Sequence, residues 1–130
     1  MESRAALIAA AREFNRGRYF EAHEVLEAAL DDLPDEQWAL FIGLIQVAVG
    51  YHKVTQQLWD GAARMLGLGL EKLDELGPDS GGVDLVNLRE RARRDRDALA
   101  ARSFAPEVFV RHPPRLRPRP IGTKFKYGPG

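Results

Sequence analysis

The segment from Trp38 to Tyr51 limits the fold more than any other part of this 130-residue chain. It is apolar on nearly every side of the helix that its composition predicts, and Gln46 interrupts it. A helix of this kind is normally covered by other elements on several sides. The run is too short to span a bilayer, which takes about 20 apolar residues. We therefore expect a central helix from about Pro34 to Gln57, buried among other helices.

Four more segments combine a helical spacing of apolar residues with stop signals at their ends. Gly17 and the run Gly77–Gly82 are such signals, and the turn at Gly17 is so short that the helices beside it must be antiparallel neighbours. The expected helices cover residues 1–16, 19–31, 60–76 and 83–101. The predicted fold class is all-α, a compact bundle of about five helices built from antiparallel helical hairpins.

The sequence also contains an internal similarity at a shift of forty positions. The shift aligns Tyr19 with Trp59, Ala22 with Ala62, Leu26 with Leu66 and Leu30 with Leu70. This pattern resembles the helix pair of tetratricopeptide repeats (TPR), in which a small residue packs against a neighbouring helix. Two copies are fewer than a stable solenoid needs, so we interpret them as TPR-like hairpins closed into one globule. Chance similarity among amphipathic helices is the alternative.

The apolar residues of the central helix should supply the middle layer of the core. The residues expected there are Trp38, Phe41, Ile42, Ile45 and Val49. In the fourth helix, Gly67 and Gly69 lower helical propensity, and a close contact with another helix would explain their presence.

The charge of the chain is divided between an acidic body and a basic end. The formal net charge is zero, but residues 1–100 carry −6 and residues 101–130 carry +6. The segment after residue 103 is rich in proline, which excludes a long helix. We expect a helical domain over 1–103 and an extended basic tail over 104–130. The residues expected to fix the tail to the domain are Phe104, Val108, Phe109, Ile121 and Phe125. The tail is expected to cross the acidic helices and partly cover the site described next.

Residues His23 and Glu27 lie one helical turn apart and project from one face. An imidazole and a carboxylate at this spacing can coordinate the same ion, and zinc accepts both ligands. Glu24 is expected to be a further ligand or to orient the histidine. The alternative is an ordinary pair of neighbours on a partly exposed helix face.

The surroundings of His23 favour a cation. The segment from Tyr19 to His52 has no Lys or Arg but seven acidic residues, which attract a cation, a basic partner or the tail. His52 is the expected third ligand or a general base, and its alternative is a core histidine hydrogen-bonded to a backbone or carboxylate group. The residues expected to orient the ligands or to face a substrate are Phe20, Glu24, Gln46 and Tyr51.

Several motifs occur together: Phe14-Asn-Arg-Gly-Arg-Tyr-Phe-Glu-Ala-His-Glu-Val-Leu-Glu27, Gly43-Leu-Ile-Gln46, Tyr51-His52 and Gly61-Ala-Ala-Arg-Met-Leu66. The combination resembles the bacterial and archaeal family DUF309 over about residues 5–75. That family is all-helical and functionally uncharacterised, and its hallmark, H-x-x-x-E followed three residues later by Trp or Tyr, has been suggested to bind metal. His23 and Glu27 match it, whereas Leu30 replaces the aromatic residue. The resemblance implies a site at His23 and Glu27 but no reaction.

The leading hypothesis is a divalent-metal site of His23, Glu27 and His52 between the second and third helices. Zinc, manganese or nickel would be the ion, and hydrolysis is one chemistry that it would support. The rival is a helical module for protein–protein interaction. Nucleic-acid binding by the basic tail is a weaker alternative, because the tail lacks a regular alternation of aromatic and basic residues.

The cysteine content and the apolar segments of the sequence indicate where the protein is located and whether it associates with a membrane. The chain has no cysteine, which excludes disulfides and thiolate metal sites. Its first residues lack the basic and then apolar pattern of a signal peptide, and no segment could span a membrane. We expect a cytoplasmic protein with no membrane association, and the sequence leaves open whether it forms homo-oligomers or is an enzyme.

Overall fold

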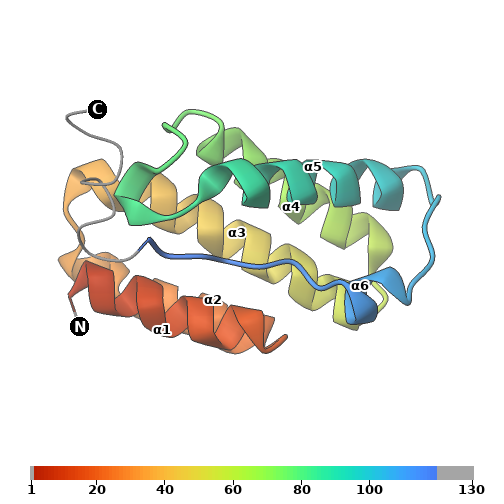
Figure 1. The fold of residues 1–130 in the computed structure, drawn as a ribbon, viewed down its shortest axis with the longest axis horizontal. Coiled ribbons are helices and arrows are strands. Elements are labelled where there is room, and N and C mark those ends of the chain that lie inside the picture. Colours follow the sequence, from red (N-terminus) through yellow and green to blue (C-terminus); the bar gives the residue numbers. More distant parts are fainter. Residues whose placement is uncertain (1, 120–130) are drawn as a thin grey trace.

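The computed structural model describes residues 2–119, which form an all-α bundle (Figure 1). The helices are α1 (Ser3–Asn15), α2 (Tyr19–Ala28), α3 (Trp38–Thr55), α4 (Trp59–Leu73), α5 (Leu85–Ala100) and α6 (Val108–Arg111). The predicted fold class and the five longer helices are confirmed. The single turn α6 is an addition, since it lies in a segment predicted to be irregular. None of the helices in the described part has the length and apolarity that a membrane crossing requires.

The connection between α2 and α3 differs from the prediction. α2 ends at Ala28, and short 3₁₀ turns follow at Leu30–Asp32 and Asp35–Gln37. Pro34 has an extended ψ of 145°, so α3 begins at Trp38 and not at the proline. The acidic residues of this connection therefore lie in turns beside the helix and not in its first turn.

α3 occupies the centre of the bundle, as expected. It packs against α2 on one side and α4 on the other, while α1 covers α2 and α5 covers α4. The predicted inner face of α3 is only partly right, because Phe41 is buried but Trp38 is 49% exposed. Ile42, Ile45 and Val49 are half-buried. The residues of α3 that are buried most deeply include Leu40, Phe41, Leu44, Val47, Ala48 and Tyr51.

Glycines decide which face of α3 is the inner one. A Cβ atom built on Gly43 would lie 2.7 Å from a methyl carbon of Leu73, and one on Gly50 would lie 2.8 Å from Leu66. From α4, a Cβ on Gly69 would lie 2.9 Å from the carbonyl oxygen of Gly43. Any larger residue at these positions would force the two helices apart. The glycines therefore set the α3–α4 contact, and the large apolar residues beside them fill the core.

The two hairpins that the internal similarity predicted have the same turn. α1 ends at a left-handed Gly17 and α3 at a left-handed Gln57, with φ of 78° and 61°. In both turns the next residue donates its N–H back to the helix, Arg18 to Glu13 and Leu58 to Lys53. This is the Schellman pattern of helix termination. The aligned aromatic residues then open the following helices, Tyr19 in α2 and Trp59 in α4.

A third turn of the same kind ends α5. Arg102 is left-handed with a φ of 55°, and the Ser103 N–H donates to the Ala98 carbonyl. Phe104 follows at the position that Tyr19 and Trp59 hold in the first two turns. Its ring packs edge-on against that of Trp59, with the ring centroids 4.9 Å apart.

The segment after α6 lies in extended form between α1 and α5 (Figure 1). Leu116 is 2% exposed, and the Asn15 side chain bonds both its N–H and its carbonyl at 2.8 Å. On the other side, the Asp84 N–H donates to the Arg117 carbonyl, next to a β-bridge between Val83 and Pro118. Leu116 thus fixes the segment, although sequence reasoning did not single it out.

The residues predicted to hold the tail have different outcomes. Phe104 and Phe109 pack against the core, and Val108 is half-buried. Ile121 and Phe125 lie outside the described residues. The anchoring contacts of residues 104–119 described above are with α1, the start of α5 and Trp59, and none of them involves His23. The predicted cover over the His23 site is thus not formed by these contacts.

Two glycines of α4 should respond in opposite directions to alanine. Gly69→Ala should lower the free energy of unfolding by about 1–3 kcal/mol, because the methyl group meets backbone atoms of α3. Gly67→Ala should raise it by up to about 1 kcal/mol, because its nearest neighbour is the Arg96 side chain at 3.5 Å and alanine favours the helix. Urea unfolding measures both, and equal effects would contradict the close contact.

The repeated turns allow a second matched pair. Gln57→Gly should raise the free energy of unfolding by up to about 1 kcal/mol, because glycine removes the strain of a left-handed side chain. Gly17→Ala should lower it by about 1 kcal/mol, and nothing lies within 4 Å of the new methyl group, so the loss reports backbone strain alone. Thermal and urea unfolding of both variants check the signs. Destabilisation by Gln57→Gly would mean that this turn is not strained.

Candidate functional site

His23 and Glu27 form a direct side-chain contact on α2. The His23 Nε2 atom lies 2.8 Å from Glu27 Oε2, and the Nδ1 atom lies 3.2 Å from the backbone carbonyl oxygen of Phe20. The histidine is mostly buried, whereas the glutamate is exposed. Both nitrogens of the ring therefore face oxygen atoms that accept hydrogen bonds. A neutral imidazole has only one N–H, so it can satisfy only one of these oxygens.

Phe20 places a second histidine near this pair. Its ring lies 5.2 Å from that of His23 and 5.1 Å from that of His52, measured between centroids. Phe20 is itself 44% exposed, so the three rings form a surface cluster contributed by α2 and α3. The three predicted ligands do not form a metal-binding group: between residues 2 and 119, no three His, Cys, Asp or Glu side chains are placed to hold one ion.

The other residues predicted for the site lie in different environments. Glu24 is exposed on α2. Gln46 is half-buried on α3, and its amide oxygen is buried without a hydrogen-bond partner in the described chain. Tyr51 is buried in the core, where its ring packs against Phe14 and Tyr19. None of these contacts joins Tyr51 to His23 or Glu27.

The comparison with protein families gives one match. Residues 7–65 match the family described as a domain of unknown function, DUF309. The match covers less than half of the chain, and the name DUF309 domain is used for residues 7–65 alone. No curated protein and no solved structure matches the chain.

The matched part spans α1, α2, α3 and the first half of α4. His23, Glu27 and His52 are therefore all within the DUF309 domain, whereas α5 and residues 104–119 lie outside it. The family description supplies no reaction and no ligand. The chemistry has to be argued from the side chains.

One buried polar network connects the DUF309 domain to α5. The Tyr51 hydroxyl donates to Asp95 Oδ2 at 2.6 Å, and Arg91 Nε donates to the same oxygen at 2.7 Å. Asp95 is only 5% exposed, and a buried carboxylate needs a partner of opposite charge. Arg91 beside it is that partner. The sequence contained a signal for this network, because the buried residues Leu88, Ala92 and Leu99 recur at helical spacing and Asp95 lies in that series. The many charged residues around them obscure this signal, because a run of charges is typical of a solvated helix face.

An apolar cavity of about 300 Å³ borders this network. It is lined by Tyr19, Tyr51, Val54, Thr55, Gln57, Trp59, Pro106, Phe109 and Val110. Burial raises the pKa of Tyr19 to about 12, and nearby Asp95 adds to the rise. Burial raises the pKa of Tyr51 well above its usual value of 10.0, helped by the negative charge of Asp95 and by the hydrogen bond to it. Both phenols are therefore neutral hydrogen-bond donors at neutral pH.

The tyrosine pKa values predict how stability changes in alkali. An unfolded tyrosine loses its proton near pH 10.0, whereas the buried phenols hold theirs to higher pH. The folded state then binds more protons than the unfolded state, so the stability present below about pH 10 is lost as the pH rises towards 12 and beyond. Tyr51→Phe should lower stability at neutral pH by about 1–3 kcal/mol, because the Asp95 hydrogen bond is lost.

Between about pH 10 and pH 12, Tyr51→Phe should lose less stability than the wild type. The variant lacks one of the two phenols whose pKa is raised in the folded state. Urea unfolding at a series of pH values measures both effects. Tyr19→Phe is the control for the other phenol of the cavity. An unchanged alkaline slope in both variants would contradict the pKa shifts.

Proposed function

We propose that the DUF309 domain binds a divalent metal ion through His23 Nε2 and Glu27 Oε2. The observation that carries this proposal is the position of the His23 ring between two oxygen acceptors. If Nδ1 donates its proton to the Phe20 carbonyl, Nε2 is left with a lone pair directed at a carboxylate. Two electron-rich atoms at 2.8 Å repel each other unless a proton or a metal ion lies between them.

The hydrogen bond from Nδ1 is also the usual partner of a metal-binding histidine. It fixes the tautomer and the orientation of the ring, so that Nε2 is presented to the ion. In a tetrahedral zinc site, nitrogen and oxygen ligands lie about 3.3 Å from one another. The observed 2.8 Å can open to this value by rotation of the exposed Glu27 side chain.

The proposed site has two protein ligands and water in the remaining positions. His52 also lies beside the Phe20 ring, but in the described chain it does not form a group of three ligands with His23 and Glu27. A metal ion with several water ligands has open positions for a substrate and lowers the pKa of bound water. This is why hydrolytic chemistry is the use of the metal that we favour. Zinc, manganese and nickel are the ions to test, and all of them accept imidazole and carboxylate ligands to different degrees.

The metal proposal predicts stabilisation by added ions. For the full chain without a histidine tag, zinc, manganese or nickel at about 100 times its Kd should raise the free energy of unfolding by about 2.7 kcal/mol. His23→Ala and Glu27→Gln should abolish the rise, because each removes one ligand. His112→Ala, which removes an exposed histidine of the tail, should leave it intact. Thermal unfolding and titration calorimetry measure the response.

His52→Ala separates a two-ligand site from a three-ligand site, since only the latter loses affinity in this variant. Calorimetry without binding at millimolar metal would overturn the metal proposal. A response that His23→Ala retains would do the same, because the ion would then be held elsewhere.

A helical interaction module is the second candidate, and the repeated hairpins favour it. Helix pairs of this kind present continuous surfaces to partners. The exposed rings of Phe20 and Trp38 lie on α2 and at the start of α3 and would supply apolar contacts there. If no added metal ion binds the chain or raises its free energy of unfolding, the interaction module becomes the better candidate.

A further inference from the structure

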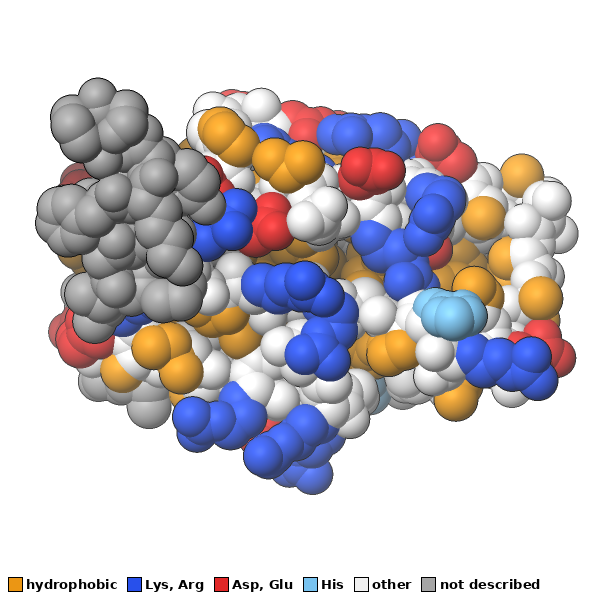
Figure 2. All heavy atoms as spheres, viewed as in Figure 1, with side chains coloured by type: hydrophobic (Ala, Val, Ile, Leu, Met, Phe, Trp, Pro, Cys, Tyr) orange, Lys and Arg blue, Asp and Glu red, His pale blue; other side chains and the backbone are white. Residues whose placement is uncertain are grey.

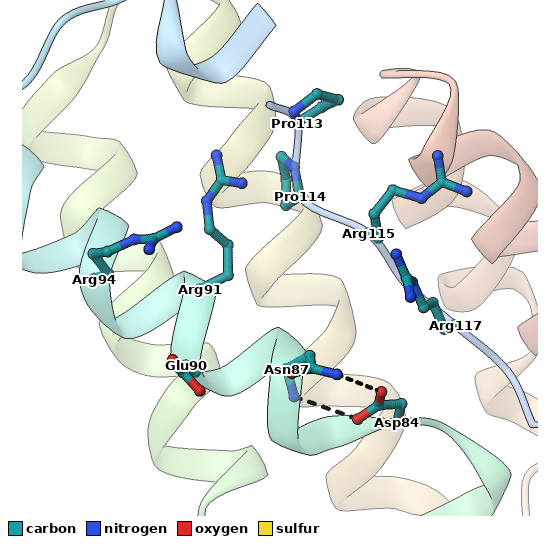
Figure 3. A pocket seen from close by; sticks show the side chains of 9 residues that line it. All are labelled: Asp84, Asn87, Glu90, Arg91, Arg94, Pro113, Pro114, Arg115 and Arg117. Carbon is teal, nitrogen blue, oxygen red and sulfur yellow. Dashed lines mark hydrogen bonds between the residues drawn. The ribbon is translucent and has the colours of Figure 1, made fainter. Parts of the chain in front are cut away.

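A second cavity, of about 430 Å³, lies between α5 and the extended segment of residues 112–119. It is lined by Asp84, Asn87, Glu90, Arg91, Arg94, Pro113, Pro114, Arg115 and Arg117. We call it the arginine basin. Arg91 and Arg94 come from α5 on one side, and Arg115 and Arg117 come from the extended segment on the other (Figure 3). It shares no residue with the His23 site and lies outside the DUF309 domain.

The arginines of the basin have unused hydrogen-bond donors. The Nη2 atom of Arg91 is buried and has no hydrogen-bond partner in the described chain, although the Nε atom donates to Asp95. Within residues 2–119, no ion pair or hydrogen bond joins the side chains of Arg94, Arg115 or Arg117 to a protein group. Arg94, Arg115 and Arg117 are exposed, so their guanidinium N–H groups are open to an anion in the basin.

Other arginines on the same elements are paired with acceptors. Arg93 binds Asp74 at 2.8 Å, Arg102 binds Asp60 at 3.0 Å, and Arg89 donates to the backbone carbonyl of Leu73 at 2.6 Å. Pairing is thus common on α5 and just after it. The arginines of the basin differ in that all four line one cavity. Blue side chains gather along this part of the surface in Figure 2 as well.

The backbone beneath the basin is fixed before any ligand arrives. Leu116 points into the core and is held by Asn15, so its neighbours Arg115 and Arg117 project to the opposite face of the extended segment. The Arg117 carbonyl accepts from the Asp84 N–H at 2.9 Å, which joins the segment to the start of α5. Positioned donors lose less entropy on binding than mobile ones.

We propose that the arginine basin binds the phosphate group of a small phosphorylated molecule. Guanidinium groups match phosphate oxygens with two parallel hydrogen bonds, and several of them neutralise a doubly charged group. The cavity volume lies in the range of small-ligand sites. Glu90 and Asn87, at the edge of the same cavity, can bind hydroxyl groups beside the phosphate. The preferred ligand is thus a phosphate ester that also carries hydroxyls.

The acidic residues of the basin favour a small molecule over a nucleic acid. Asp84 and Glu90 lie among the arginines and would repel a continuous phosphate backbone. Asp84 is further held by two hydrogen bonds from Asn87, so it stays in the basin as a fixed negative charge. A nucleic-acid surface instead carries a track of positive charge. Binding to RNA is therefore the competing outcome of the test.

The test uses the full chain, with pyrophosphate and ribose 5-phosphate as probes. Titration calorimetry is run in about 0.15 M sodium chloride, which screens long-range attraction, and with EDTA, which removes divalent ions. Arg94→Gln and Arg115→Gln should each weaken binding about tenfold or more, because each removes charge-assisted hydrogen bonds. Both side chains are exposed, so both variants should fold.

Arg93→Gln is the matched control, because it removes the same charge from α5 but outside the basin. It should change the affinity by less than about twofold. His23→Ala should leave the affinity unchanged, which separates this proposal from the metal site. Equal losses in all three arginine variants would overturn the basin, as would no binding at millimolar probe. Binding of a single-stranded RNA oligomer that pyrophosphate does not displace would also overturn it.

Discussion

The close contact between α3 and α4 determines the arrangement of the rest of the bundle. Gly43, Gly50 and Gly69 let the two backbones approach until the side chains of Leu66, Leu73 and Val47 lie against bare helix. Because dispersion forces decline steeply with distance, a tight contact of this kind stabilises more than a wider one of equal area. The contact also fixes how far α5 stands from α3, since α5 packs on α4. Tyr51 on α3 can therefore reach Asp95 on α5 across the core.

That hydrogen bond places a charged group in an apolar interior, which has consequences beyond stability. A buried carboxylate is tolerated only with strong partners, and here Tyr51 and Arg91 provide them. Any shift of α5 along α4 would break the hydrogen bond from Tyr51, whereas Arg91 lies on α5 with Asp95 and would move with it. The network therefore selects one register of α5 among those that apolar packing alone would allow. It also orients Arg91, whose side chain lines the arginine basin.

Local features could be predicted from the sequence, and long-range pairings could not. Helical spacing and Gly17 located the hairpins, and the shift of forty residues identified two turns that prove equivalent. The His23–Glu27 contact was also predictable, because one helical turn fixes it. The inner face of α3 could not be predicted, because a helix that is apolar on all sides shows no alternation of apolar and polar residues that would mark one face. The missing information lay in its glycines.

The pairings missed by sequence reasoning join residues far apart in the chain. Tyr51 and Asp95 are separated by 44 positions, and Asn15 and Leu116 by 101. Leu116 stands among prolines and arginines, so nothing local distinguishes it from a solvent-exposed residue. The arginine basin exists only because Leu116 brings the extended segment to α5. The residue types indicated that the tail is basic, but only the packing shows that Arg115 and Arg117 line a cavity beside α5.

The turn at Arg102 repeats the turns that join the helices of the two hairpins. α5, its left-handed residue and Phe104 repeat the way in which the first two hairpins begin. No long second helix follows in the described chain. The single turn α6 and the extended segment fill its place and contribute Leu116 to the core. Helical repeats that stack in series need a terminal unit to close the open apolar end. Residues 105–119 act as this cap, so the two hairpins close into one compact bundle.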